Sequence, residues 1–261
     1  MKQYIVDAFA DELFTGNPAA VLPCMKMPDA DLMLKIAIEN NYSETAFVVK
    51  RRPGEYDLKW FTPGGEIDLC GHATLGTAFV VSTFVDPGVE EMHFHTLSGE
   101  LIVRKTDAGF TMNFPVGISK PIPLTQVLMD AAGGIAREAF YDGGDMVLIV
   151  SDEEALQAFV PDEEKILKTE GVGFILTASS KTYDFVSRCF YPKLKILEDP
   201  VTGRAHTYMT PIWHRKLGKS VMRAKQISSR GGILTVEDKG DRILISGNVQ
   251  LFMEGNIPFE L

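Results

Sequence analysis

The chain has 261 residues, enough for one large domain or two of ordinary size with a substantial buried core. Its 26 Lys and Arg residues face 35 Asp and Glu residues, and the net charge of −9 argues against nucleic acid as a partner because a basic surface is missing. No apolar run approaches the roughly 18 residues of a membrane helix, so a membrane is not expected as a partner either.

The cysteines and the first residues indicate where the protein works. Cys24, Cys70 and Cys189 are scattered without a CxxC pair, so neither a disulfide framework nor a zinc site is expected. The four histidines at 93, 95, 206 and 214 have no metal-ligand spacing with nearby acids. The N-terminal residues lack the apolar segment of a secretory signal. We therefore predict a reduced, cytoplasmic setting and no metal site.

The first half of the chain alternates short strands with two helices. Strands are predicted at residues 4–9, 43–49 and 56–61 from their alternating apolar pattern. A helix is expected from Asp29 to Asn40, and a second one after Gly71. Three further apolar segments separated by turns predict a meander at residues 92–96, 101–105 and 110–114.

A proline-rich stretch between Pro115 and Pro123 is the best candidate for a domain boundary. Beyond it, helices are predicted at residues 126–132, 152–159 and 162–169, strands at 172–177 and 183–191, and a last helix and meander after Thr202. Strands outnumber helices, and each half has one long helix, which indicates a mixed α+β or α/β fold. We predict domains at residues 1–115 and 116–261, and the C-terminal strand is a candidate to return to the first domain.

The stretch from Glu66 to Gly76 is the first candidate for a functional site. An apolar strand ends there at Leu69, Cys70-Gly71 makes a turn, and a helix follows. The unpaired N–H groups and the positive dipole end at a helix start form a pocket for an anion such as a carboxylate. His72 adds an ionisable group at this point. An ordinary glycine-containing turn with an exposed histidine is the alternative.

A second copy of this pattern strengthens the functional reading. Thr202-Gly203-Arg204 also follows an extended segment and begins a helical one. Gly71 is followed by Gly99 and Gly203 by Gly231, in both cases 28 residues later, and a similar apolar strand comes next. We interpret this as a duplicated unit whose two helix N-termini could face one cleft. Chance remains the alternative, because glycine turns are common in hairpins.

Two carboxylates and one thiol are further candidates for chemistry. Glu44 stands at a strand start beside Phe47, and partial burial would raise its pKa toward general acid/base duty. Asp199 precedes Pro200 just before the second glycine turn. A thiolate at Cys70 would be stabilised by the helix start. The alternatives are a solvated carboxylate for Glu44, a turn residue for Asp199 and a small buried apolar residue for Cys70.

Taken together, these segments resemble the phenazine-biosynthesis isomerase family, the PhzF-like proteins. The matching segments occur in the order of the family over most of the chain: Asp7-Ala8-Phe9, Phe14 to Val21 (FTGNPAAV), Ser43 to Phe47 (SETAF), Phe61-Thr62-Pro63, Leu69 to Thr74 (LCGHAT) and Glu198 to Gly203 (EDPVTG). The resemblance implies a diaminopimelate-epimerase-like fold of two similar domains. Each is a sheet wrapped around a central helix, with the active site between them, and a homodimer is expected.

The resemblance also implies roles for individual residues. Glu44 would be the proton-transferring acid/base, and His72 and Asp199 would position and polarise the substrate. The turns at Gly71 and Gly203, with Cys70 and Thr202 beside them, would contact a substrate carboxylate. The implied reaction is a proton shift without a cofactor on a small anionic substrate.

One position departs from the family pattern. The second loop usually reads Thr-Gly-Ser-Ala-His, but here Arg204 stands in place of the serine. Arginine can bind a carboxylate or phosphate with two hydrogen bonds, so Arg204 is predicted to select a substrate with a further anionic group. The alternative is that it points outward into an ion pair.

Three functions remain open at this stage. The first is an isomerase that acts by proton transfer through Glu44. The second is a thiol-dependent epimerase or racemase, which needs a cysteine at each helix start. Cys70 meets that requirement, but Thr202 occupies the other position and Cys189 is far upstream in the sequence. The third is a protein that binds a small acid without turning it over.

Overall fold

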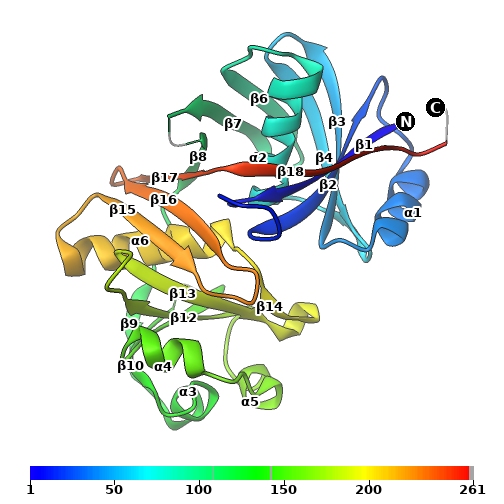
Figure 1. The fold of residues 1–261 in the computed structure, drawn as a ribbon. Coiled ribbons are helices and arrows are strands. Elements are labelled where there is room, and N and C mark those ends of the chain that lie inside the picture. Colours follow the sequence, from blue (N-terminus) through cyan, green and yellow to red (C-terminus); the bar gives the residue numbers. More distant parts are fainter. Residues whose placement is uncertain (108, 142, 259–261) are drawn as a thin grey trace. The chain divides into compact units, whose positions relative to one another are not determined.

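A computed structural model describes residues 1–107, 109–141 and 143–258 of the chain (Figure 1). The fold mixes α-helices and β-strands, which confirms the predicted class. The chain divides into two compact units: Met1–Asn113 together with the C-terminal segment from Ser246, and Phe114–Ile245. Among the described residues, no helix is both long and apolar enough to cross a membrane.

The first unit is built from strands with three helical segments between them. Its elements are β1 (Lys2–Ala8), β2 (Asn17–Cys24), α1 (Ala30–Asn40), β3 (Glu44–Arg52), β4 (Glu55–Thr62), β5 (Gly65–Ile67), α2 (Gly71–Val80), the π-helical segment η1 (Val81–Val85), β6 (Glu91–Thr96), β7 (Gly99–Thr106), β8 (Gly109–Pro115) and β18 (Val249–Asn256).

The strand pairing of this unit joins its two ends. β18 pairs with β1, so the red and dark blue strands of Figure 1 run side by side in opposite directions. From β1 the sheet continues through β2, β3 and β4, and then through β6, β7 and β8. Only the pairs β2–β3 and β4–β6 among these are parallel. The predicted meander at residues 92–114 is confirmed as β6, β7 and β8.

Helix α2 is the central helix of the first unit. It contacts β1, β2, β3 and β18, and almost all of its side chains are buried. A helix buried on every face needs small residues where the sheet comes close. Gly76 is such a position, because a Cβ atom there would lie 2.6 Å from Val6 Cγ2 on β1. The close approach holds α2 against β1 at this position.

The second unit has a similar set of elements. These are β9 (Lys120–Ile122), α3 (Gln126–Ala131), β10 (Ala136–Tyr141), β11 (Asp145–Val150), α4 (Glu153–Ala158), α5 (Glu163–Leu167), β12 (Gly173–Ser179), β13 (Phe185–Tyr191), the 3-10 turn η2 (Pro192–Leu194), β14 (Ile196–Asp199), α6 (Gly203–Leu217), β15 (Val221–Gln226), β16 (Gly232–Asp238) and β17 (Arg242–Gly247).

The pairing pattern confirms the duplication predicted from the sequence. The series β2–β3 parallel, β3–β4 antiparallel, β4–β5 antiparallel, β4–β6 parallel and β6–β7 antiparallel occurs in the first unit. The second unit repeats it with β11–β12, β12–β13, β13–β14, β13–β15 and β15–β16. Helices α2 and α6 occupy the same place in the two series, and each begins at the glycine of its motif.

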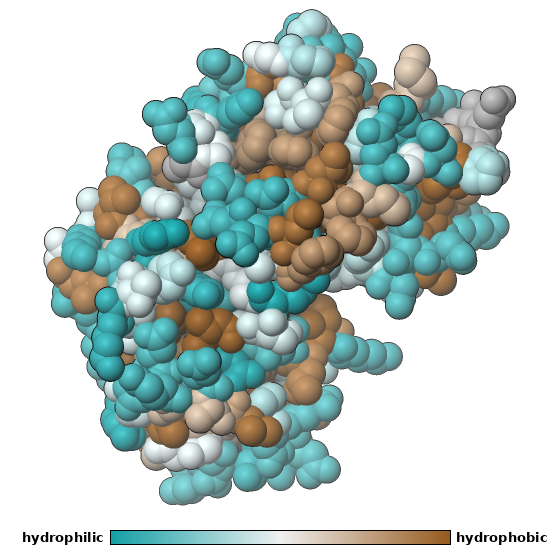
Figure 2. Space-filling model, viewed as in Figure 1, coloured by the Kyte–Doolittle hydropathy of each residue, from teal (hydrophilic) through white to brown (hydrophobic). Residues whose placement is uncertain are grey.

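Hydrophobic side chains fill a core in each unit. One core of the first unit lies between α1 and the strands, and includes Met33, Phe47 and Phe61. The core of the second unit includes Leu148, Phe174 and Phe190. On the face shown in Figure 2, hydrophobic side chains form groups among hydrophilic ones. The strands and helices that carry the predicted site residues are therefore anchored by ordinary apolar packing.

Candidate active site

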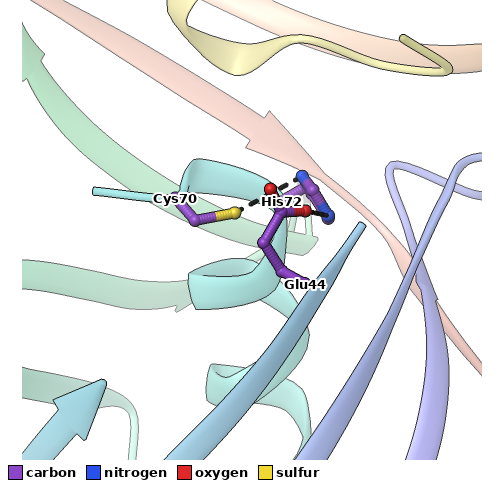
Figure 3. A group of neighbouring side chains, drawn as sticks. All are labelled: Glu44, Cys70 and His72. Atoms are coloured by element: carbon purple, nitrogen blue, oxygen red, sulfur yellow. Dashed lines mark hydrogen bonds and ion pairs between the residues drawn. The ribbon is translucent and has the colours of Figure 1, made fainter. Parts of the chain in front are cut away.

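Three of the predicted site residues meet in the first unit. Glu44 is the first residue of β3, Cys70 is the N-cap of α2, and His72 is the second residue of that helix. His72 Nε2 lies 3.0 Å from Glu44 Oε2, and Cys70 Sγ lies 3.5 Å from His72 Nδ1 (Figure 3). The imidazole therefore contacts the carboxylate through one nitrogen and the thiol through the other.

The cluster is buried but retains a small exposed area. The side chain of His72 is 8% exposed and that of Glu44 is 13% exposed, and Cys70 is buried as well. An ion pair in such surroundings is little screened by solvent, so each partner strongly affects the protonation of the other.

The pKa of Glu44 corrects the expectation drawn from the sequence. Burial by itself would raise the pKa of Glu44, as predicted, but the charge and hydrogen bond of His72, together with hydrogen bonds from Ser43 and Cys70, outweigh it and the net pKa is lowered. Burial likewise opposes the charged form of His72, but the charge of Glu44 and the hydrogen bonds with Glu44 and Cys70 hold the pKa of His72 above its usual value. The prediction was wrong because it considered burial without the neighbouring imidazole. The pair is a carboxylate facing an imidazolium at neutral pH.

The thiol of Cys70 is held protonated. Burial raises its pKa and the carboxylate of Glu44 raises it further, while His72 and the backbone N–H of Ala73 lower it by less. Cys70 therefore lies at the helix start as predicted, but as a thiol rather than a thiolate.

Asn17 was quoted in the sequence motif without a role, and the structure places it in this cluster. It is the fully buried first residue of β2, and its side-chain Nδ2 lies 3.3 Å from His72 Nδ1. β2 runs parallel to β3, with Ala19 opposite Glu44. A polar residue just before an apolar strand was the signal available in the sequence, but the contact with His72 arises from the strand pairing.

The two motif helices differ from the other helices in how they begin. Side chains cap α1, α3, α4 and α5, where Asp29, Thr125, Asp152 and Asp162 accept a backbone N–H. The N-cap residues of α2 and α6, Cys70 and Thr202, make no such hydrogen bond, and neither helix has an acidic residue in its first turn. Both helix starts thus keep their positive dipole end without a side-chain acceptor at the N-cap.

A side chain one turn later holds each of these N-cap residues. The hydroxyl of Thr74 donates to the carbonyl of Cys70 in α2. In α6 the ring Nδ1 of the fully buried His206 lies 2.8 Å from the carbonyl of Thr202. Burial lowers the pKa of His206 to about 4, so its imidazole is neutral and Nδ1 carries the proton. In both copies, a side chain therefore fixes the N-cap carbonyl without bonding the N–H groups of the first helical turn.

The second motif loop carries the remaining predicted residues. The hydroxyl of Thr202 donates to Asp199 Oδ2. The fully buried side chain of Gln226 connects both ends of the loop: its Nε2 donates to the carbonyl of Asp199 at 2.6 Å, and its Oε1 accepts the N–H of Thr202 at 2.9 Å. Gln226 could not be predicted from the sequence, because it follows the loop at the end of a distant strand, β15.

Cys189 requires a second correction. It is far from the second motif in sequence, but β13 pairs with β14 so that Cys189 lies opposite Asp199. Its thiol donates to Gln226 Oε1 at 3.4 Å. A second cysteine therefore does lie at the start of α6. It is completely buried, and burial raises the pKa of its thiol well above the usual value.

Arg204, the residue that departs from the family pattern, makes an ion pair. Its Nε lies 3.3 Å from Oδ2 of Asp145, the first residue of β11, and its guanidinium lies over the ring of Tyr208. The side chain of Arg204 is 58% exposed whereas that of Asp145 is 1% exposed. The structure thus matches the alternative given for Arg204, and a role in substrate selection stays a prediction.

Replacing Arg204 by serine is expected to destabilise the protein by about 1–3 kcal/mol, because the buried carboxylate of Asp145 loses a charged partner. Asp145 would keep the hydrogen bond from the N–H of Gly173. Urea unfolding of Arg204→Ser, Asp145→Asn and the double variant measures this effect. We expect the double variant to be more stable than Arg204→Ser alone. If the stability loss of the double variant equals the sum of the losses of the two single variants, the two side chains do not interact.

The family model described as phenazine biosynthesis-like protein matches residues 6–255. The chain belongs to this family. It is 44% identical over 252 residues to an uncharacterized isomerase of Pseudomonas aeruginosa, an alignment that covers 97% of this chain and 96% of the relative. The resemblance inferred from the sequence motifs is therefore confirmed.

Solved structures of the PhzF family share this fold over nearly their whole length. A protein from Enterococcus faecalis is 45% identical with a TM-score of 0.94, and the match covers 97% of both chains. One from Clostridium difficile is 43% identical with the same TM-score, covering 99% of this chain and 100% of the other. A probable proline racemase of Agrobacterium radiobacter, only 12% identical, has a TM-score of 0.61 and covers 99% of this chain and 93% of its own. The epimerase-like fold predicted from the sequence is confirmed.

Proposed function

We propose that this PhzF-like protein is an isomerase that moves a proton between carbon atoms of a small carboxylate-bearing substrate, with Glu44 as the general acid/base. The observation that carries the proposal is the buried Glu44–His72 pair at the start of a helix without a side-chain cap. A proton shift next to a carboxylate needs a base beside the carbon and a group that stabilises the developing negative charge.

Glu44 supplies the base and the acid in turn. With its pKa lowered, Glu44 is ionised at neutral pH and can accept a proton, but as a weaker base than an ordinary glutamate, so the helix start must stabilise the negative charge that develops on the substrate. The electron pair left by the proton moves toward the substrate carboxylate. A carboxylic acid of low pKa returns its proton readily, which suits a shift that ends with the proton on another carbon. No external proton donor or acceptor is needed for this balance.

His72 is proposed to position Glu44. The imidazolium contact at 3.0 Å holds the carboxylate in one orientation, and Asn17 stands at the other ring nitrogen. The first-turn N–H groups of α2, at Gly71 and His72, and the helix dipole would bind the substrate carboxylate. These groups are fixed before the substrate arrives, so little reorganisation opposes the reaction.

The second motif is proposed as a further anion-binding element. α6 also begins without a side-chain cap, and Gln226 fixes the loop between Asp199 and Gly203. Asp199, Thr202 and Arg204 remain candidates for contact with substrate on the strength of the family resemblance. A homodimer stays a prediction as well.

One observation supports the thiol-dependent epimerase and another argues against it. Cys70 lies at the start of α2, and Cys189 lies at the start of α6 after all. The pKa of each thiol is raised by burial, however, and a protonated, buried thiol is a poor base. The acid/base route through Glu44 is the better supported of the two.

Hydrogen exchange at carbon tests the proposed function. A library of small carboxylic acids is first screened by the rise in melting temperature of the protein on binding. Each hit is then incubated with the protein in D2O, and proton NMR follows deuterium uptake at carbon. We expect uptake at the carbon next to the carboxylate for at least one hit. Binding without any uptake would support the binding-protein alternative. Uptake that is lost in Cys189→Ser but kept in Glu44→Gln would support the thiol route.

A further inference from the structure

We propose that Glu44, Cys70 and His72 together form a binding site for a thiophilic divalent cation such as Zn²⁺, and that the bound ion blocks the proton transfer. Each residue offers one ligand atom, and the three atoms all lie within 4.8 Å of one another. They come from two elements only, the start of β3 and the start of α2 (Figure 3).

The chemistry of the three ligands fits Zn²⁺. A carboxylate oxygen, an imidazole nitrogen and a thiolate sulfur are its usual protein ligands. With bonds of about 2.0–2.3 Å in a tetrahedral site, sulfur and nitrogen ligands stand roughly 3.5 Å apart. Cys70 Sγ and His72 Nδ1 already have this separation of 3.5 Å. The third ligand, Glu44, contacts the opposite ring nitrogen, Nε2, at 3.0 Å, and the three ligand atoms lie within 4.8 Å of one another. Binding a single ion therefore requires the imidazole or the carboxylate to rotate so that Glu44 shares the ion with Cys70.

The charges also balance. An ionised Glu44 and a thiolate at Cys70 carry two negative charges, which a divalent cation neutralises, while His72 binds as the neutral imidazole. Starting from a thiol, an imidazolium and a carboxylate, binding forms three metal–ligand bonds and releases two protons, one from sulfur and one from nitrogen. Binding should therefore be tighter at higher pH. Three protein ligands leave a fourth position for water or for a substrate oxygen.

The inhibition rests on the proposed function, whereas the binding does not. An ion held by Glu44 occupies the lone pair that would accept the substrate proton, and it removes the imidazolium that holds the carboxylate. Zn²⁺ would then inhibit turnover by binding the residues of the acid/base cluster themselves.

A comparison inside the same unit supplies a control. His93 on β6 lies between two carboxylates, 2.9 Å from Glu91 Oε1 and 3.2 Å from Glu100 Oε1. Neither of these two contacts involves a sulfur atom. These side chains are also more exposed than the cluster around His72. If any histidine–carboxylate contact were enough, His93→Gln would weaken binding as much as a change at the cluster.

Cobalt titration of the reduced, chelator-treated protein tests the binding without substrate. Co²⁺ bound to a thiolate gives a charge-transfer absorption in the near ultraviolet, and added Zn²⁺ should displace it. We expect one ion per chain, loss of the band in Cys70→Ser, and an affinity for Zn²⁺ at least tenfold weaker in both Cys70→Ser and Glu44→Gln. His93→Gln and Cys24→Ser should retain the band and the affinity. Far-ultraviolet circular dichroism checks that each variant is folded.

Two results would overturn the site: no thiolate band in the parent protein, or a band that persists in Cys70→Ser. A band with the expected dependence on Cys70, together with carbon–hydrogen exchange that Zn²⁺ does not slow, would leave the metal site in place and refute the inhibition. Absence of exchange under all conditions would count against the proposed function alone.

Discussion

Glu44→Gln is expected to lower the rate of proton exchange on the substrate by about 10²–10⁴-fold, the range that a positioned general acid/base contributes. Glutamine has nearly the same volume as glutamate, and its carbonyl oxygen still accepts a hydrogen bond from His72. It cannot take up a proton in the relevant pH range. The variant should therefore keep its fold and bind the small acid found in the screen with an affinity within a few fold of the parent protein.

The measurement combines the exchange rate by NMR with the dissociation constant by calorimetry. Glu39→Gln on α1 is the matched control, because Glu39 is an exposed glutamate on a neighbouring element outside the cluster. It should exchange at the parental rate. Parental activity in Glu44→Gln would remove Glu44 from the mechanism. Loss of binding together with activity would instead assign Glu44 to substrate binding.

The sequence predicted the local geometry of the site well, because each signal was local. The turn at Cys70-Gly71 begins α2 as expected, and Glu44 is the first residue of β3. A strand followed by a glycine and a helix specifies its own conformation through neighbouring residues. The duplicated spacing then predicted the equivalent helix start at Gly203.

Contacts made through strand pairing were not accessible in the same way. Cys189 lies at the second helix start because β13 pairs with β14, and Gln226 closes that loop from the end of β15. The buried partner of Arg204 is Asp145, which is the first residue of β11. Nothing in the residues around these three positions indicates their partners. The pKa of Glu44 was misjudged for the same reason, since its sign depends on an imidazole from another element.

His72→Gln is expected to cost about 3–5 kcal/mol in the free energy of unfolding near pH 6, because it leaves the buried carboxylate of Glu44 without its charged partner. The double variant Glu44→Gln/His72→Gln should recover much of this loss, since no buried charge remains unpaired. Urea unfolding of the parent, the two single variants and the double variant gives the coupling energy directly. A coupling energy near zero would show that the pair is not an ion pair in solution.

His214→Gln provides the matched control for this experiment. His214 Nδ1 lies 3.0 Å from Asp238 Oδ2, nearly the separation of the Glu44–His72 pair, but the side chain of His214 is 42% exposed. The partner carboxylate of Asp238 is 9% exposed, so this half-exposed pair should cost about 1–3 kcal/mol, less than the loss expected for His72→Gln. A loss as large as that of His72→Gln would point to the removal of a histidine as such rather than to burial of the pair.

The pH dependence of the stability loss in His72→Gln distinguishes the contribution of Glu44 from that of His72. The lowered pKa of Glu44 contributes stability that is present above its usual value near 4.5 and is lost as the pH falls through its folded-state pKa. The raised pKa of His72 contributes stability that is present below its usual value near 6.5 and is lost as the pH rises through its folded-state pKa. The difference between the parent protein and His72→Gln should thus be largest between about pH 4.5 and 6.5.

The acidic limb of the pH–rate profile should shift in His72→Gln. Without the imidazolium, burial is opposed only by the hydrogen bonds of Ser43 and Cys70, so the pKa of Glu44 rises and a larger fraction of the base is protonated at mildly acidic pH. The acidic limb of the pH–rate profile is expected to move to higher pH, while Asn17→Ala, which keeps the ion pair, should shift it much less. An unchanged limb in His72→Gln would mean that a group other than Glu44 titrates there, because the residue that lowers its pKa would be gone without effect.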